Sequence, residues 1–113
     1  MAVNKNSLGF LLADVTRQMR RAFEKRFAGS FLTLAQARVL VYVSRQEGIR
    51  QIDLAELLDV RPITLTRLID QLVAGGVMER RPDPNDRRAY QLYLLPSAKA
   101  HLESIEQVTR SIR

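Results

Sequence analysis

The stretch VRPITLTRLIDQLVAGG, residues 60–76, decides the fold because it predicts one helix with two different faces. Apolar residues that recur at intervals of three and four form a single stripe along a helix, and such a stripe packs into a core. The stripe here comprises Leu65, Leu68, Ile69, Leu72 and Val73. Pro62 suits a first turn, where its missing N–H costs no hydrogen bond, and Gly75-Gly76 supplies the left-handed conformation that ends a helix.

The opposite side of this helix carries mainly hydrogen-bonding side chains. It collects Ile63, Thr64, Arg67, Asp70 and Gln71. A face of this kind meets either water or a ligand. A polar helix surface is ordinary by itself, so the segments on either side have to decide between the two interpretations.

Two helices are predicted before residue 50. Apolar residues at helical spacing, interleaved with arginine and lysine, predict an amphipathic helix over residues 8–28 that stops near Gly29. Its basic face suits phosphates or an acidic membrane surface, although a solvated charged face is the commoner meaning of this pattern. Thr33 and Gln36 form a T-x-x-Q capping box that starts a second helix at residue 34. This helix, expected to end near Gln46, is apolar on nearly all sides and therefore belongs at the centre of the domain.

Residues 50–95 predict a helix-turn-helix followed by a hairpin. A third helix is expected over residues 51–58, joined by Asp59-Val60 to the helix described first. Its inward residues are expected to be Ile52, Leu54, Ala55 and Leu58. Two short helices joined by a tight turn match helix-turn-helix geometry, with an ordinary helical hairpin as the alternative.

The downstream residues favour the helix-turn-helix. Residues 77–81 and 89–94 alternate apolar with polar and flank the turn formers at 82–86, so they predict paired strands, and Ile49 is expected to pair briefly at their edge. A last helix begins at Pro96. The predicted fold is a single domain over residues 1–113, mainly α with a small β-hairpin. A winged helix-turn-helix at 50–95 is flanked by helices at 8–28 and 96–113.

Composition limits the classes of function. With 113 residues, 46% of them hydrophobic, the chain has the size of one domain, and it contains no cysteine. Disulfides, thiolate metal sites and cysteine nucleophiles are therefore excluded. The single histidine, His101, has no nucleophile or carboxylate placed with it, so we expect a surface residue and no catalytic site, cofactor or metal. Without a secretory signal or membrane-spanning run, the chain is expected in the cytoplasm.

The net charge of +6 is weak evidence for nucleic-acid binding because of where the charges lie. Residues 1–50 carry nine Lys and Arg against three acids, whereas residues 51–113 carry nine of each. The half of the chain that contains the helix-turn-helix has no excess charge. Any attraction to DNA there depends on where individual arginines sit.

Three motifs occur in a fixed order: Leu54-Ala55-x-x-Leu58, Thr64-Leu65-Thr66-Arg67-Leu68-Ile69-Asp70-x-Leu72, and Gly76-Val77-x-Glu79-Arg80-x-Pro82-Asp83-Pro84-x-Asp86-Arg87-Arg88. In this order and spacing they resemble the signature of the MarR-type winged-helix transcriptional regulators, and the resemblance extends over residues 8–113. The Asp86-x-Arg88 motif is its most specific part. Leu95-Pro96-Ser97-Ala98 is closer to the SlyA-like branch than to the Thr-Pro-acid-Gly start usual for the last helix.

The resemblance implies a partner and a mode of binding. In this family the helix equivalent to residues 61–74 enters the major groove, the wing arginine reaches into the minor groove, and the first and last helices of two chains intertwine into a homodimer. Many members are repressors released by small anionic aromatic compounds. Members also add a further helix after the position equivalent to residue 113, so we expect a weaker dimer from this chain.

The outer face of the helix at 61–74 is predicted to read bases. Arg67 offers the fork that pairs with guanine O6 and N7, and Ile63 suits a thymine methyl group. Thr64 and Gln71 are expected to contact base edges or phosphates, and Arg61 stands where the family usually has a capping Ser. Asp70 is acidic on this face, so we expect it to orient a neighbouring arginine, for which Arg67 at i−3 is the candidate.

In the wing, Asp86 is predicted to hold Arg88 extended, so that its guanidinium enters a narrow minor groove of enhanced negative potential. Arg87 is predicted to act mainly through phosphate charge. The alternative is a hairpin tip with a surface ion pair of little value. The preceding helix-turn-helix favours the DNA-binding interpretation.

The flanking helices predict a dimer, because their apolar stripes are longer than one winged helix can cover. The interface residues are expected to be Leu8, Leu12, Val15, Met19, Leu102, Ile105, Val108 and Ile112. A two-fold axis would place two recognition helices about one DNA turn apart, or a multiple of it, on a pseudo-palindromic site. A cleft beside these helices is expected to take an aromatic carboxylate, with Arg17, Arg20 or Arg21 as its anion partner.

These observations predict a sequence-specific regulator that binds double-stranded DNA, a repressor relieved by a small aromatic anion. The alternative is a winged-helix module that contacts only proteins and docks through its basic first helix. The charge balance of residues 51–113 is the best support for that alternative. An enzyme is the least favoured class.

Overall fold

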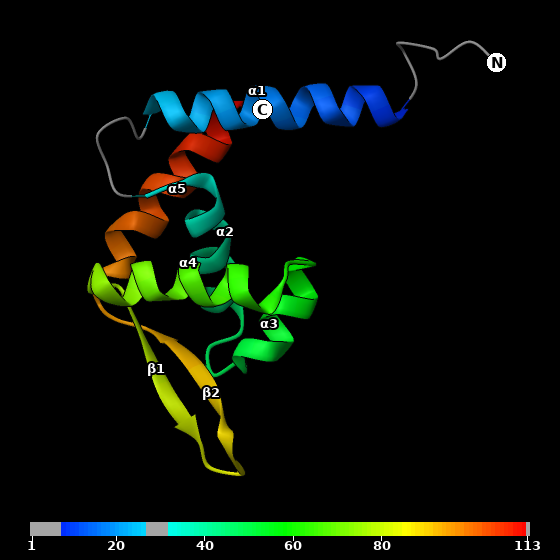
Figure 1. The fold of residues 1–113 in the computed structure, drawn as a ribbon. Coiled ribbons are helices and arrows are strands. Elements are labelled where there is room, and N and C mark those ends of the chain that lie inside the picture. Colours follow the sequence, from blue (N-terminus) through cyan, green and yellow to red (C-terminus); the bar gives the residue numbers. More distant parts are fainter. Residues whose placement is uncertain (1–7, 27–31, 113) are drawn as a thin grey trace, which may run out of the picture.

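The computed structural model describes residues 8–26 and 32–112, with the side chains of residues 111 and 112 left out of the description (Figure 1). The elements are α1 (Leu8–Arg26), α2 (Leu34–Arg45), α3 (Gln51–Leu58), α4 (Pro62–Ala74), β1 (Met78–Asp83), β2 (Asp86–Leu94) and α5 (Ala98–Ile112). Mainly helical with one two-stranded antiparallel hairpin, this is the predicted fold class. The expected end of the first helix near Gly29 lies outside the described residues.

Helix α2 is the central element, as its apolar sequence predicts, and it contacts α1, α4, α5 and β2. Val39, Leu40 and Val43 are completely buried. The predicted capping box is present: the Thr33 hydroxyl accepts from the Gln36 amide at 3.2 Å, and the Gln36 side chain accepts from the Thr33 amide at 2.8 Å. Two N–H groups at the start of α2 are thus satisfied by local chemistry.

Helices α3 and α4 form the helix-turn-helix, and α3 has the predicted bounds. The turn depends on Asp59, whose φ of 55° and ψ of 47° are left-handed, a conformation that Asp tolerates better than most residues. One inward assignment was wrong: Ile52 is 62% exposed, while the remaining three are buried. Over two turns, an apolar residue beside the stripe is easily taken for part of it.

Helix α4 begins with Pro62 in its first turn, as predicted. Leu65, Ile69 and Leu72 are completely buried, whereas Val73 at the edge of the stripe is exposed. Only the second glycine has the predicted left-handed conformation: Gly75 is right-handed at φ −77°, and Gly76 has φ +75°. The reversal into β1 therefore takes place at Gly76, two residues after the last helical residue, Ala74.

The hairpin is longer than predicted. Residues 82, 83 and 86 belong to the strands rather than to the turn, because Pro82 still pairs with Tyr90, and an irregularity in register follows at Asp83. The Asp83 carboxylate accepts from the Asn85 amide at 2.8 Å, which closes the tip over two residues. The predicted edge pairing at Ile49 is present, since its carbonyl accepts from the Leu92 amide at 3.0 Å.

Helix α5 begins at Ala98, two residues later than predicted, after a turn in which the Ser97 hydroxyl donates to the Gly76 carbonyl at 2.6 Å. Helix α1 lies across α5 and α2 at one end of the molecule, and its N-terminal half projects beyond them (Figure 1). Phe23, near its C-terminal end, is the one residue of α1 that is buried. The winged helix and the α1 arm are therefore two unlike regions.

Candidate nucleic-acid interface

The outer face of α4 is the first part of the candidate site. Arg61, Ile63, Arg67 and Gln71 are exposed there, and Thr64 is half-buried. Ile63 is 77% exposed, so this apolar side chain does not pack into the hydrophobic core. Arg67 makes no hydrogen bond or ion pair with any described residue, which leaves its guanidinium available to a ligand. Because the apolar stripe of α4 is buried, this face points outward.

Asp70 does not orient Arg67, so that assignment was wrong. Its carboxylate pairs instead with Arg80 of β1, at 2.5 Å from Oδ1 to Nη2. The Arg80 guanidinium also donates to the Thr66 carbonyl at 3.3 Å and to the Gln51 side chain at 3.2 Å. Sequence analysis missed this partner because it lies ten residues away, beyond the turn that folds β1 back onto α4.

Gln71 has a partner inside the protein. The Gln36 side chain of the capping box donates from Nε2 to Gln71 Oε1 at 2.7 Å. The start of α2 is thereby bonded to α4. The amide nitrogen of Gln71 has no partner among the described residues, and the oxygen keeps a second lone pair, so the side chain retains free hydrogen-bonding capacity.

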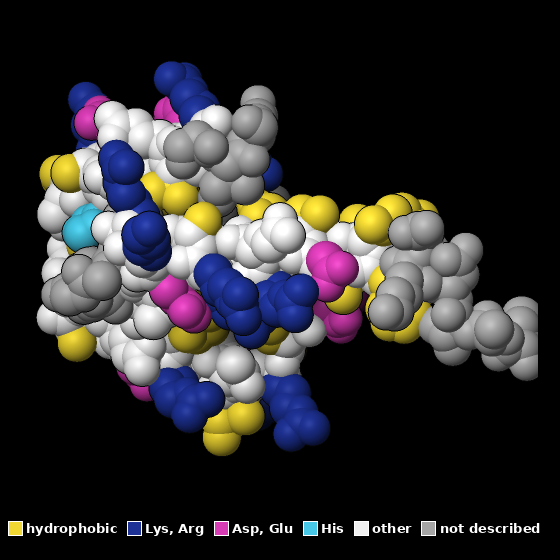
Figure 2. Space-filling view, turned by 90° about the horizontal axis from the view of Figure 1, so that it is seen from above, with side chains coloured by type: hydrophobic (Ala, Val, Ile, Leu, Met, Phe, Trp, Pro, Cys, Tyr) yellow, Lys and Arg dark blue, Asp and Glu magenta, His cyan; other side chains and the backbone are white. Residues whose placement is uncertain are grey.

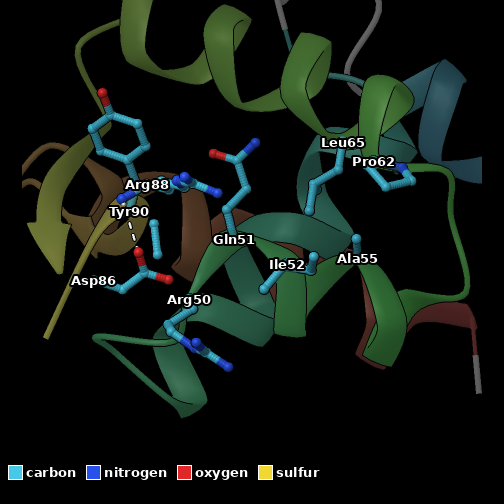
Figure 3. A pocket seen from close by; sticks show the side chains of 10 residues that line it. Arg50, Gln51, Ile52, Ala55, Pro62, Leu65, Asp86, Arg88 and Tyr90 are labelled. Carbon is cyan, nitrogen blue, oxygen red and sulfur yellow. Dashed lines mark hydrogen bonds between the residues drawn. The ribbon is translucent and has the colours of Figure 1, made fainter.

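The wing is the second part of the site. Asp86, Arg87 and Arg88 are exposed where β2 begins. Asp86 accepts from the backbone N–H of Arg88 at 3.0 Å, and no ion pair joins the two side chains. The Asp86-x-Arg88 motif therefore shapes the backbone of the wing rather than gripping the guanidinium, as Figure 3 shows from close by.

A groove of about 310 Å³ lies between the helix-turn-helix and the wing (Figure 3). Pro62 and Ile52 belong to its helical side, and Arg88 and Tyr90 to its wing side. Arg50, also on the helical side, holds both carboxylate oxygens of Asp53, at 2.9 and 3.3 Å. That hydrogen bond, followed by the charge of Asp53, raises the pKa of Arg50 above its ordinary value, so the residue stays cationic.

The three arginines predicted to bind an effector lie apart. Arg17 is paired with Asp14 at 3.0 Å on the exposed side of α1, and Arg21 is exposed. Arg20 lines a hollow of about 640 Å³ between α1 and α2. Beside it, a pocket of about 270 Å³ lies between α1, α2 and α5, with Met19, Phe23, Leu34 and Val108 among its apolar lining residues.

That smaller pocket has a cationic rim which sequence analysis missed. The guanidinium carbons of Arg38 and Arg45 lie 6.0 and 5.8 Å from the centre of the Tyr42 ring, and all three residues line the pocket. Their spacing of four and three residues places them on one face of α2. This spacing was visible in the sequence, but their position beside a pocket was not.

The predicted dimer residues fall into two groups. On α1, Leu8, Leu12 and Val15 are exposed, Leu8 at 72%, and yellow side chains follow the projecting arm in Figure 2. Met19 and Leu102 are half-buried, and the side chain of Ile112 lies outside the description. Ile105 and Val108 are buried within this chain, so assigning them to an exposed stripe was wrong. They face α1 and α2, which cover α5 in the same subunit.

The remaining expectations concern His101, metal ions and membranes. His101 is half-buried, so the expectation of a surface residue holds only in part. No three His, Asp or Glu residues of the described chain gather where they would hold a metal ion. Among the described helices, none is both long and apolar enough to cross a membrane.

A helix-turn-helix with an exposed polar second helix, followed by a hairpin wing, defines the winged-helix class of DNA-binding proteins. The model of the MarR family matches residues 32–90, and the chain belongs to that family. The multiple antibiotic resistance protein MarR of Escherichia coli is 32% identical over 101 residues, which cover 89% of this chain and 70% of that relative. The transcriptional repressor YetL of Bacillus subtilis is 29% identical over 94 residues, 81% of this chain and 56% of YetL.

Three solved structures illustrate how closely this fold is shared. A MarR crystal structure superposes with a TM-score of 0.90 at 27% identity, covering 99% of this chain and 77% of that one. A mutant of E. coli MarR, complexed with operator DNA, gives 0.80 at 29% identity, with 93% and 79% covered. Bordetella bronchiseptica BpsR, whose DNA binding is regulated by 6-hydroxynicotinic acid, gives 0.81 at 26% identity, with 99% and 83% covered. The chain is a DNA-binding transcriptional regulator and not an enzyme.

Proposed function

We propose that the chain is a sequence-specific repressor that binds a pseudo-palindromic operator as a homodimer and is released by a small aromatic anion. The exposed outer face of α4 carries this proposal. It presents an arginine fork without a partner among the described residues, at Arg67, and an apolar side chain in water, at Ile63. A solvated arginine and a single exposed isoleucine are ordinary on a protein surface, but together on the second helix of a helix-turn-helix both suit the edges of base pairs.

In the proposed complex α4 lies in the major groove. Arg67 pairs with guanine, Ile63 packs on a thymine methyl group, and Thr64 and the free amide nitrogen of Gln71 contact base edges. Arg61 and Arg87 contact phosphates, which add affinity without sequence preference. Arg88 enters the minor groove beside it, from a wing backbone held by Asp86.

The homodimer is supported by the exposed α1 arm. Exposed apolar side chains follow the projecting half of α1. Contiguous exposed apolar patches often mark contact sites for a partner. Two copies related by a two-fold axis would cover both arms and present two α4 helices to DNA. The operator would then carry two half-sites about 34–36 Å apart, or a multiple of that distance.

Repression and its relief are supported by the relatives. YetL is named a transcriptional repressor, and the DNA binding of BpsR is regulated by 6-hydroxynicotinic acid. The pocket of about 270 Å³ suits a one-ring acid, because it combines an apolar lining with Tyr42 and the guanidinium groups of Arg38 and Arg45. Arg20, in the neighbouring hollow, remains a candidate. The predicted cytoplasmic location agrees with a repressor, which acts at the chromosome.

Selection of bound duplexes from a random pool tests the DNA-binding proposal. We expect enrichment of a two-fold repeat by the whole chain, and loss of preference at a few positions within each half-site for Arg67→Ala. A pool that stays random with the unmodified chain would overturn the proposal and favour the module that contacts only proteins.

A titration of the DNA complex with salicylate and with 6-hydroxynicotinate tests the effector. We expect release at up to millimolar concentration, and a weaker response after Arg38→Met or Arg45→Met. Arg21→Met is the matched control: the sequence offered Arg21 as an anion partner too, but this arginine is exposed and lines none of the cavities described above. Unchanged DNA affinity for both compounds would contradict the proposed effector class.

A further inference from the structure

One guanidinium joins three elements of the winged helix. Arg80 extends from β1, bonds Asp70 and the Thr66 carbonyl of α4, and bonds the side chain of Gln51 of α3. Gln51 itself donates to the Thr66 hydroxyl at 2.9 Å, so the groups around Arg80 are also tied to each other. The Arg80 side chain is only 23% exposed, so the guanidinium at the centre of this cluster is largely enclosed.

The cluster constrains the direction of the hairpin. Only Gly75, Gly76 and Val77 connect α4 to β1, and glycine adds little stiffness to such a connection. On its other side the hairpin is tied to the start of α3, through the pairing of Leu92 with Ile49. Arg80 adds the tie to α4, at the position where β1 pairs with Leu92. Both edges of the hairpin are then held, and its angle to α4 is fixed.

The cluster also compensates an acidic side chain on the recognition helix. Asp70 is 60% exposed, and it lies one helical turn from Arg67. Without a cation beside it, this carboxylate would repel DNA phosphates. Its ion pair with Arg80 turns it toward β1 and balances its charge.

We propose that Arg80 is a positioning residue for DNA binding: it sets the angle between the wing and the recognition helix, and it shields DNA from Asp70. The inference rests on the proposed function, because it assigns no contact between Arg80 and DNA. Arg80 acts through Asp70, Thr66 and Gln51, which hold it in place.

The test compares Arg80→Met with Arg81→Met. Arg81 is the next residue of β1 and faces the other side of the hairpin, where it pairs with Glu79 and stacks on Tyr93 at 3.8 Å. Both variants lose one positive charge. We expect Arg80→Met to weaken operator binding about tenfold or more, and Arg81→Met to change it less than about threefold. Selection with Arg80→Met should keep the bases read by α4 and lose those beside the wing.

A second substitution separates positioning from simple loss of charge. Adding Asp70→Asn to Arg80→Met should restore part of the lost affinity, because the unshielded carboxylate is gone, while the preference beside the wing stays lost. Where Arg80→Met fails to fold, Arg80→Lys replaces it. Lysine keeps the charge beside Asp70 without the fork that reaches Thr66 and Gln51, so affinity should be kept and the preference lost.

The outcomes that overturn the inference are distinct from failure of the proposed function. If the unmodified chain selects no sequence, the proposed function itself fails. If it selects an operator and both methionine variants behave alike, or if Asp70→Asn rescues nothing and the preference beside the wing persists, Arg80 is not a positioning residue. Thermal unfolding of each variant shows whether the variant is folded.

Discussion

The winged helix and the α1 arm differ in whether their apolar side chains are buried. In the winged helix the stripe of α4 is covered by the same chain, and Leu65, Ile69 and Leu72 are completely buried. Along the projecting half of α1, Leu8, Leu12 and Val15 remain exposed although their spacing is as regular. A helical stripe therefore predicts burial, but it does not say which chain provides the cover.

The two regions also differ in their polar contacts. The winged helix is crossed by side-chain hydrogen bonds between elements, such as those of Gln51, Gln71 and Arg80. On α1, the side-chain bonds from Thr16 to Leu12 and from Arg17 to Asp14 stay within that helix. We infer that the winged helix is stabilised by contacts within its own chain, whereas the α1 arm is covered by a second subunit.

The largest effect is expected from a cavity in the core of the winged helix. Leu65→Ala leaves a cavity in a fully buried site and should lower the free energy of unfolding by about 2–5 kcal/mol. Chemical denaturation at low protein concentration provides the measurement. Leu12→Ala is the matched control, since Leu12 is exposed in the single chain and should change the value by less than about 0.5 kcal/mol. Equal losses from both would contradict the comparison.

The next effect concerns the arm. Leu12→Asp places a carboxylate in the proposed interface and should weaken self-association about a hundredfold, while a single chain keeps its stability. Sedimentation equilibrium across micromolar concentrations measures the change. If the unmodified chain is a strict monomer throughout and occupies one half-site, the dimer proposal fails while the winged-helix assignment stands.

Within the winged helix, Arg67→Ala should reduce discrimination at a small number of base positions, by about 1–3 kcal/mol against the preferred base. Binding to the selected operator and to single-base variants of it measures this loss. A weakening of equal size on random DNA would instead identify Arg67 as a phosphate contact.

The smallest effect is expected at the wing tip. Arg87→Ala should lower the slope of log affinity against log salt concentration by about one and leave base preferences unchanged, because one phosphate contact is lost. Affinities measured from about 50 to 200 mM salt provide the slope. An altered base preference at unchanged slope would assign Arg87 to readout rather than to charge.

Features set by local chemistry could be predicted from the sequence. The capping box of Thr33 and Gln36, the bounds of α3 and the tight turn at Asp59-Val60 each depend on residues within a few positions of one another. The outward face of α4 followed from helical period alone. The winged-helix class could be inferred because these local features succeed one another in a characteristic order.

Features that depend on tertiary packing could not be predicted. The partner of Asp70 depends on how β1 folds back onto α4. The exposure of Ile52 depends on which of several apolar residues in α3 pack into the core. The pocket beside Tyr42 needs the crossing of α1, α2 and α5. The contacts with DNA, effector and a second subunit stay predictions, because they involve molecules other than this chain.

The Gln36 side chain satisfies two elements at once. Its oxygen caps α2, and its nitrogen holds Gln71 on α4. Leu34, in the first turn of α2, lines both the pocket beside Tyr42 and the hollow beside Arg20. A small molecule that shifts this turn would disturb α4 through one hydrogen bond. Thermodynamic linkage is reciprocal, so operator DNA would change affinity for that molecule by the same factor by which the molecule changes affinity for the operator.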